Sequence, residues 1–250
     1  MRLPDFIIGG APRSGTTWLY SLLARHPDVY MAAPVTPEPK FFLVDEIYEK
    51  GLHFYAKTWF AAAGGRCAGE KSTDYLESAP AAERIARDLP GVKLVFILRE
   101  PVDRAYSNYL WTRMNGLEHE DFETALQHEE RRERELPARL KFTRPFSYFS
   151  RGLYADLLAP YVERFPHEQM LIPRFEDIGS KPAALAERLQ RFLGLAPRAG
   201  DFEGLGVINP SERDTNGLAP GIRDGLRARY AEPNRRLADM LGSDFEMWRC

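Results

Sequence analysis

The stretch GGAPRSGTTW at residues 9–18 follows the apolar run FII and precedes a segment in which apolar residues recur at helical spacing. A glycine-rich turn between a strand and a helix directs backbone N–H groups and the positive end of the helix dipole at one point, where an anion can bind. Both glycines and Thr17 fit the phosphate-binding pattern GxxxxGK[ST], but Thr16 replaces the lysine, and Arg13 supplies a cation from inside the loop. We therefore interpret the stretch as an anion site rather than as a turn without a ligand.

The rest of the chain alternates short apolar runs with longer segments of helical period, a pattern typical of a parallel sheet wrapped by helices. The expected strands are Phe6–Gly9, Val29–Ala32, Arg66–Glu70, Leu94–Leu98 and Met170–Pro173. The expected helices cover residues 16–25, 45–60, 79–88, 101–115, 121–135, 152–164, 183–193 and 220–241, and Gly194 ends the seventh. Because there is no internal repeat and no Ser/Gly linker, we predict a single α/β domain over residues 1–250.

Composition limits the partners of this protein. Hydrophobic residues make up 44% of the chain and charged residues 28%, as in an ordinary globular protein. The formal net charge of −2 provides no basic field for nucleic acid, so any anion site must be local. Cys67 and Cys250 are far apart in sequence, which favours a reducing compartment over a disulfide framework. No apolar run approaches the about 18 residues of a membrane span, so we expect a soluble cytoplasmic protein.

A second strand-to-helix junction lies in LVFILREPVDRAYSNY at residues 94–109. Pro101 occupies a first-turn position, where proline is tolerated, so Arg99 ends the strand and Ser107 lies two turns into the helix. Both side chains can address an anion at the carboxyl edge of the sheet. The alternative is a surface ion pair of Arg99 with a neighbouring acid and a Ser107 that faces solvent. Because this strand ends in arginine rather than in an acid that could hold Mg²⁺, a nucleotide triphosphatase is disfavoured.

A candidate base follows a third strand, in GEKSTDYLE at residues 69–77. Glu70 and Lys71 come at the end of the strand, where catalytic groups collect in open parallel sheets. The alternative is an exposed carboxylate that pairs with Lys71 or Arg66.

These segments together resemble one protein family. PRSGTTWL at 12–19 resembles the 5′-phosphosulfate loop of sulfotransferases that use 3′-phosphoadenosine 5′-phosphosulfate (PAPS), and R-x-P-x-x-R-x-x-S at 99–107 resembles their 3′-phosphate motif. EKSTDYL at 70–76 resembles the EKS-x-x-YF segment of heparan-sulfate sulfotransferases, whereas arginine in the PRSGTT loop resembles the tyrosylprotein sulfotransferases. The resemblance implies a three-layer P-loop-like fold with a central parallel sheet flanked by helices, and PAPS as the donor with 3′,5′-ADP as its product.

The resemblance also implies roles for individual residues. It makes Glu70 the catalytic base and Arg13 a stabiliser of the departing nucleotide, while Lys40, in EPKFF, and Lys71 steer the sulfuryl group or the acceptor. It assigns donor contacts to Arg13, Ser14, Gly15, Thr16, Thr17, Trp18, Arg99 and Ser107, with support from Arg104 and, in the loop SERDTNG at 211–217, from Arg213. No histidine matches a catalytic position of the family, and no metal ion is required.

The expected reaction is therefore in-line transfer of a sulfuryl group from PAPS to an acceptor hydroxyl, with a small molecule or a glycan as acceptor. Sulfation of an amine, a nucleotide-dependent kinase with an unusual loop, and a binding module without turnover are the alternatives. Segment 116–151 is the candidate acceptor region. We expect its first part, Glu118–Glu135, to form a solvated helix, and its second part, Arg131–Arg151, to be either a basic and aromatic acceptor site or a loop packed on the core.

Overall fold

The chain folds into two compact units. The computed structural model describes residues 1–198, 200–206 and 217–248. The first unit comprises the described residues of Met1–Leu98 and Leu158–Ile208, and the second those of Arg99–Leu157 and Asn209–Cys250. Within the described ranges, every helix is either too short or too polar to cross a lipid bilayer.

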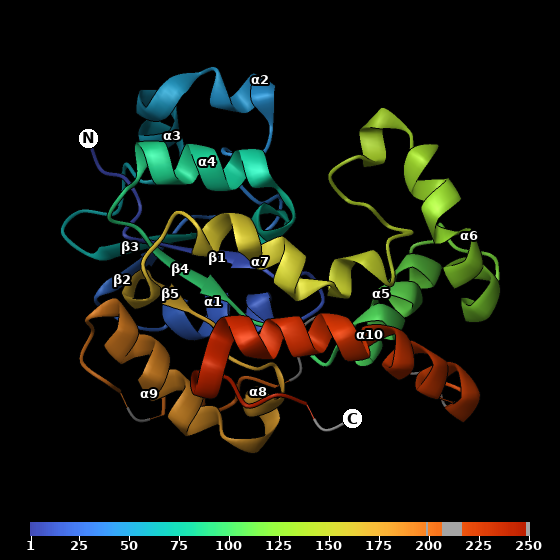
Figure 1. Cartoon of the computed structure of the whole chain (residues 1–250). Helices are drawn as coiled ribbons and strands as arrows, with labels where there is room; N and C mark the ends of the chain where they lie inside the picture. Colours follow the sequence, from blue (N-terminus) through green and yellow to red (C-terminus); the bar gives the residue numbers. More distant parts are fainter. Residues whose placement is uncertain (199, 207–216, 249–250) are drawn as a thin grey trace. The chain divides into compact units, whose positions relative to one another are not determined.

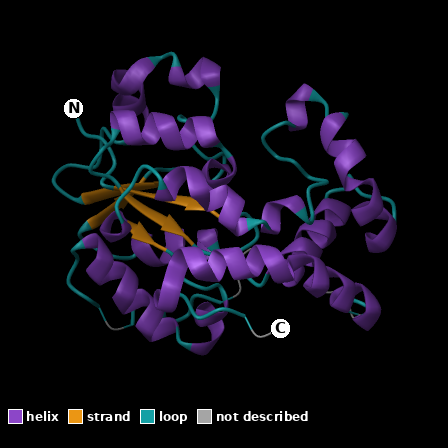
Figure 2. Ribbon diagram, in the orientation of Figure 1, coloured by secondary structure: helices purple, strands orange, loops and turns teal. Residues whose placement is uncertain are grey.

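A sheet of five parallel strands in the order β2-β3-β1-β4-β5 forms the centre of the first unit (Figure 2). The strands are β1 (Phe6–Gly10), β2 (Val29–Met31), β3 (Cys67–Lys71), β4 (Lys93–Phe96) and β5 (Met170–Leu171). All five predicted strands are confirmed. β4 and β5 each end two residues earlier than predicted, although Leu98, beyond β4, still forms a parallel bridge with Arg174. Because all strands are parallel, their carboxyl ends share one edge of the sheet.

Helices cover both faces of this sheet. The helices of the first unit are α1 (Thr16–Ala24), α2 (Asp45–Tyr48), α3 (Gly51–Trp59), η1 (Thr73–Glu77), α4 (Ala79–Asp88), η4 (His167–Gln169), α8 (Glu176–Ser180) and α9 (Pro182–Leu193). A further helix, α7 (Tyr154–Val162), begins in the residue range of the second unit and ends in that of the first. Phe6 and Ile8 of β1 pack with apolar residues of α1 and α9, whereas Phe96 of β4 contacts Tyr161 on the other face. In Figure 1, α4 and α9 lie on opposite sides of the sheet. The predicted three-layer arrangement is therefore confirmed.

The predicted helix over residues 45–60 is wrong in its extent, and one α-helix, α8, was not predicted. The segment 45–60 forms two helices, α2 and α3, because Gly51 adopts a left-handed conformation with φ of +78° between them. The five-residue helix α8 has no counterpart among the predicted elements. The predicted stop at Gly194 is confirmed, since this residue caps α9 with φ of +80°.

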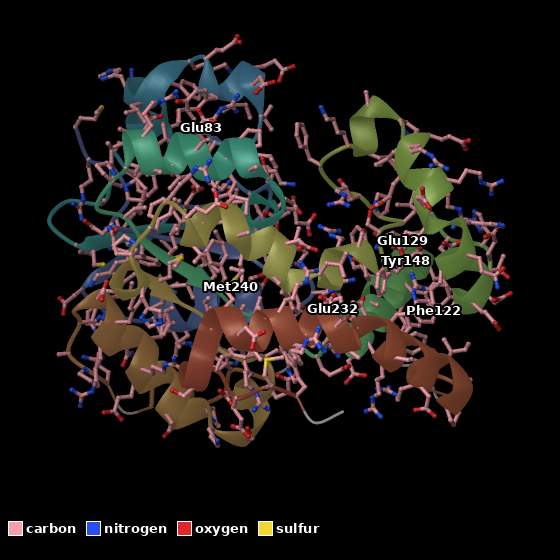
Figure 3. All side chains as sticks on the ribbon, in the orientation of Figure 1. Glu83, Phe122, Glu129, Tyr148, Glu232 and Met240 are labelled. Atoms are coloured by element: carbon pink, nitrogen blue, oxygen red, sulfur yellow. The ribbon has the colours of Figure 1, made fainter. Side chains whose placement is uncertain are left out.

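The second unit is helical. It contains α5 (Pro101–Met114), α6 (Phe122–Arg134), η2 (Ala138–Leu140), η3 (Ser150–Gly152), α10 (Pro220–Leu241) and η5 (Gly242–Asp244). Its core is built from α5, α6, α10 and the segment around Tyr148, and Figure 3 shows Phe122 and Tyr148 in this region. The rings of Phe122 and Tyr148 meet edge to face with centroids 6.0 Å apart.

The prediction that residues 118–135 form a solvated helix is only partly correct. The pair Glu130–Arg134 is exposed and bridged at 2.8 Å, as the i, i+4 spacing predicts. Glu129, however, is buried, and its carboxylate accepts the backbone N–H groups of Phe149 and Ser150 at 2.7 and 2.8 Å. One face of α6 therefore holds the following loop in place by hydrogen bonds to its backbone.

Close packing at Gly69 yields a test of the fold. A Cβ added to this residue of β3 would lie 2.1 Å from Cζ of the fully buried Phe6 ring. Because that ring is enclosed by the core, we expect Gly69→Ala to lower the free energy of unfolding by about 1–3 kcal/mol in urea denaturation. Gly65→Ala is the control, since a Cβ there would meet no atom within 4 Å. Equal stability of the two variants would contradict the packing described.

Candidate active site

The loop between β1 and α1 presents the amino-terminal end of a helix. Gly15 caps α1 in the left-handed conformation with φ of +89°, and Arg13, two residues earlier, also has a positive φ of 65°. The N–H groups of a first helical turn have no acceptor within the helix, and no acidic residue stands in this turn of α1. No side chain of this first turn therefore neutralises the positive end of the α1 dipole. A helix N-terminus that binds an anion needs such an uncompensated end.

The loop is held closely by its neighbours in the first unit. A Cβ at Gly15 would lie 2.5 Å from Cδ1 of Ile178 in α8, so glycine is needed for the fit as well as for the left-handed conformation. The Trp18 side chain is buried in the core, and its indole N–H donates to the Leu205 carbonyl at 3.4 Å. The Trp18 side chain thus fixes the first turn of α1 to the core of the first unit.

The other loop residues predicted to bind the donor differ in exposure. The side chains of Ser14 and Thr16 are buried, whereas Arg13 and Thr17 are half-buried. The Ser14 hydroxyl lies 3.5 Å from the Pro12 carbonyl, so it helps to close the turn. The predicted donor residues of this loop therefore lie in the connection between β1 and α1, up to Gly15, and in the first turn of α1, at Thr16–Trp18.

Glu70, the predicted base, is completely buried in β3. Its Oε1 accepts the hydroxyls of Tyr55 at 2.7 Å and Tyr75 at 3.0 Å, and its Oε2 accepts the hydroxyl of Ser72 at 3.1 Å. Among the described residues the Glu70 carboxylate has these three hydroxyl partners and no ion pair. The alternative of an exposed carboxylate paired with Lys71 or a nearby arginine is therefore wrong.

Burial raises the pKa of Glu70 to about 7, against an ordinary value of 4.5. Desolvation is the largest cause, and the nearby Glu38 carboxylate acts in the same direction. The hydroxyls of Tyr55, Tyr75 and Ser72 lower the pKa by stabilising the ionised form, but they offset only part of the burial. A carboxylate that titrates near neutral pH is well matched to proton transfer.

Both lysines that were predicted to steer the sulfuryl group or the acceptor form ion pairs. Lys71, buried at the end of β3, pairs with Glu38, whose other oxygen accepts the Thr73 N–H at 3.0 Å. Lys40 pairs with Asp74. Each of the two lysines therefore has a carboxylate beside it that offsets its charge.

The hydroxyl groups that hold Glu70 were not predicted as its partners. Tyr55 and Tyr75 stand in the sequence 15 residues before and five residues after Glu70, a spacing that in extended or helical backbone predicts no contact. They meet Glu70 because the Tyr55 side chain of α3 reaches the end of β3 and because the short helix η1 follows that strand after a single residue. Tyr75 is the tyrosine of the EKS-x-x-YF resemblance at 70–76, but neither tyrosine was assigned a role from the sequence.

In the second unit, the predicted anion-binding residues lie at and near the start of α5. Pro101 is the first residue of this helix, as predicted, and the Glu100 side chain caps it by accepting the Asp103 N–H at 2.7 Å. Ser107 is buried, so the alternative of a solvent-facing serine is wrong. Arg99 is half-buried, and its carbonyl accepts the Tyr154 hydroxyl at 2.8 Å.

Arg104 adds a buried cation to the same helix. Its side chain is fully buried, and Nη2 donates to the Tyr148 carbonyl. Nε and Nη1 have no hydrogen-bond partner among the described residues. Buried guanidinium donors are normally satisfied, so these two fit an anionic ligand such as a phosphate.

Arg213, assigned to the donor by resemblance, lies in 207–216, outside the described residues. In the part of the chain that the structure describes, no group of three or more His, Cys, Asp or Glu residues is arranged to hold a metal ion.

Fold and sequence place the chain in a family. Residues 3–205 match the family model described as the sulfotransferase domain, so the chain belongs to the sulfotransferase domain family. It is 36% identical over 266 residues to mouse heparan sulfate glucosamine 3-O-sulfotransferase 3B1, covering 98% of this chain and 65% of that protein. It is 31% identical over 216 residues to human bifunctional heparan sulfate N-deacetylase/N-sulfotransferase 3, covering 82% of this chain and 24% of that protein.

A solved structure has the same architecture. The crystal structure of a sulfotransferase from Alicyclobacillus acidocaldarius matches with a TM-score of 0.81 and 26% identity, covering 98% of each chain. The present chain spans less than two thirds of the length of the two curated relatives described above.

Glu70 also makes stability depend on pH. Between its ordinary pKa of 4.5 and its folded value of about 7, the native state keeps a proton that the unfolded state has lost. The free energy of unfolding should therefore fall by about 3 kcal/mol as the pH rises through this range, and Glu70→Gln should remove that part of the decrease. Urea unfolding of both proteins at about pH 5 and about pH 8 measures the difference. Identical pH dependence would contradict the burial of an ionisable carboxyl here.

Proposed function

We propose that this protein transfers a sulfuryl group from PAPS to an acceptor hydroxyl on a carbohydrate or a small metabolite, with Glu70 as the general base. The observation that carries the proposal is a fully buried, hydroxyl-bonded carboxylate on the strand next to the one that leads into the predicted anion loop. Glu70 pairs in register with Ile7 of β1, so Glu70 and the loop after Gly10 come from adjacent strands of one sheet. Adjacent carboxyl ends are where parallel sheets bind ligands.

The loop residues are assigned to the reacting end of the donor. PAPS supplies an activated sulfuryl group, whose bond to the 5′-phosphate oxygen breaks as the acceptor oxygen attacks. The N–H groups of the first turn of α1, with Thr16 and Thr17, hold the phosphosulfate, and Arg13 stabilises the charge that develops on the departing phosphate. Glu70 takes the proton of the acceptor hydroxyl. Catalysis on this scheme is mostly positioning and electrostatics.

The 3′-phosphate is assigned to Arg99 and Ser107, with Arg104 in support. The two buried, unsatisfied nitrogens of the Arg104 guanidinium support an anion at α5, because a phosphate would satisfy them. Arg213 keeps the donor role that the resemblance assigns to it.

Lys40 and Lys71 are assigned to the sulfuryl group and the acceptor. Each is held by a carboxylate, so its ammonium group is fixed in place before a ligand arrives. A positioned cation of this kind can share its charge with sulfuryl oxygens without leaving its partner.

The acceptor proposal follows the chemistry named in the relatives. The mouse relative is named as a glucosamine 3-O-sulfotransferase, which supports a hydroxyl on a sugar. The human relative that is 31% identical is named as an N-sulfotransferase, which makes an amine the second candidate. Assays with matched hydroxyl and amine acceptors distinguish the two.

Nucleotide binding is the first test. We expect calorimetric titration to detect binding of 3′,5′-ADP without Mg²⁺, and Arg99→Ala to weaken it by about 1.5–3 kcal/mol because a charge-assisted hydrogen bond is lost. Arg134→Ala is the control, since this exposed residue lies on α6 and, among the described residues, pairs with Glu130 of the same helix. Unchanged affinity in Arg99→Ala would refute the 3′-phosphate assignment. Mg²⁺-dependent binding of ATP, with 3′,5′-ADP ignored, would favour a kinase.

Turnover tests the base. Glu70→Gln should lower the rate of sulfuryl transfer by about 10² to 10⁴, while affinity for 3′,5′-ADP is retained, because only proton transfer is removed. Glu83→Gln provides the control, since this residue is exposed on α4 (Figure 3). A rate near that of the unmodified protein in Glu70→Gln would remove Glu70 from the mechanism.

A further inference from the structure

The two oxygens of the Glu70 carboxylate are not equivalent. An ionised carboxylate offers about four lone-pair sites, two on each oxygen. Oε1 accepts two hydrogen bonds, from the hydroxyls of Tyr55 and Tyr75, whereas Oε2 accepts one, from Ser72. Among the described residues, the remaining acceptor capacity of this carboxylate therefore lies on Oε2.

Two of the three hydroxyls that donate to Glu70, those of Tyr75 and Ser72, are themselves oriented by backbone N–H groups of the segment 38–42. The Phe42 N–H donates to the Tyr75 hydroxyl oxygen at 3.2 Å, and the Lys40 N–H donates to the Ser72 hydroxyl oxygen at 2.9 Å. Each hydroxyl oxygen thus already accepts a hydrogen bond, which leaves its own proton directed at Glu70. One short segment fixes a donor on each side of the carboxylate.

The two tyrosine rings have little freedom to move. Both are fully buried, and the Tyr55 ring stacks on Phe41 with centroids 4.3 Å apart and planes 15° apart. The Tyr75 ring meets Phe42 edge to face at 5.9 Å. Aromatic packing of this kind contributes stability beyond the burial of apolar area, and it holds the side chains of Tyr55 and Tyr75 each in one rotamer.

We propose that Tyr55 and Tyr75 are positioning residues that occupy Oε1 of Glu70 and leave Oε2 as the single oxygen that takes the acceptor proton. The proposal rests on the proposed function, since it specifies which atom of the base reacts. Neither tyrosine contacts the reacting atoms in this scheme; both act through Glu70.

The chemical step is then defined atom by atom. The O–H bond of the acceptor breaks as its proton moves to Oε2 of Glu70. The acceptor oxygen forms a bond to sulfur, and the electron pair of the sulfur–oxygen bond to the 5′-phosphate leaves with 3′,5′-ADP. The proton on Oε2 is released to solvent after the products leave, which restores the carboxylate.

The groups that face Glu70 determine the expected pH dependence. They are Tyr55 on α3, Tyr75 on η1, Ser72, and Glu38, which pairs with Lys71. Burial raises the pKa of both phenols well above their ordinary 10.0, so they stay protonated donors throughout the neutral range. Each donor lowers the pKa of Glu70, so removing one donor should raise that pKa. As the pH falls, Glu70 should then become protonated, and stop acting as a base, at a higher pH than in the unmodified protein.

The experiment compares Tyr55→Phe and Tyr75→Phe with Tyr48→Phe. Each site variant removes one hydroxyl and keeps the ring. Tyr48 is a matched control because its hydroxyl also donates to a carboxylate, that of Asp88, and its ring packs on Phe41 and Phe42 in the same aromatic cluster without contacting Glu70.

Two readouts are needed. The first is the carboxyl titration of Glu70 in protein labelled with ¹³C-glutamate, assigned as the resonance absent from Glu70→Gln and followed without substrate. The second is the pH profile of kcat/KM for sulfuryl transfer from PAPS. We expect both midpoints to rise by about one pH unit in Tyr55→Phe and Tyr75→Phe, to stay unchanged in Tyr48→Phe, and the rate to recover toward the original plateau at high pH.

The outcomes separate this proposal from the proposed function. A titration midpoint unchanged in both site variants overturns the proposal, whatever the activity. A midpoint that rises while the acid limb of kcat/KM stays in place also overturns it, since the tyrosines would then not act on the reacting group. If the unmodified protein transfers no sulfuryl group to any acceptor, the proposed function fails, and the titration alone decides whether the tyrosines hold Oε1.

Discussion

Burial of the Glu70 carboxylate is the constraint on which the first unit depends. Removing an ionised carboxylate from water costs several kcal/mol unless hydrogen bonds replace the lost hydration. Three hydroxyls provide part of that replacement, from Tyr55 on α3, from Tyr75 on η1 and from Ser72 beside the strand. The helix α3 and the segment 38–42 are therefore part of the site, because they carry or orient these donors.

The same physical principle organises the second unit. Glu118 is buried, and its Oε2 accepts the Tyr148 hydroxyl at 2.7 Å and a hydrogen bond from Arg132 at 2.6 Å. Glu129 accepts two backbone N–H groups of the loop that follows Tyr148 (Figure 3). These carboxylates tie down a segment whose basic and aromatic composition suggested either an acceptor site or a packed loop. For Tyr148 the second interpretation holds, since its ring is in the core.

Much of the architecture could be predicted because its signals are local. Apolar runs bounded by glycine, proline or charge marked all five strands, and the helical period with a glycine stop marked α9 to within one residue of its start. The errors also have local causes. The helix predicted over 45–60 is divided by the backbone conformation of Gly51, and α8 is only five residues long, so tertiary packing rather than intrinsic propensity stabilises it.

The sequence by itself determined the parallel sheet, with Glu70 near the end of one strand and Arg13 and Arg99 each three residues beyond another, because strand ends follow from short-range hydrophobic patterns. Only the tertiary structure decided that Glu70 is buried, that three hydroxyls hold it, and that Lys40 and Lys71 pair with acids. These contacts join residues up to 34 positions apart on different elements. They arise from the packing of helices against the sheet, and that packing depends on the whole core rather than on any single stretch of sequence.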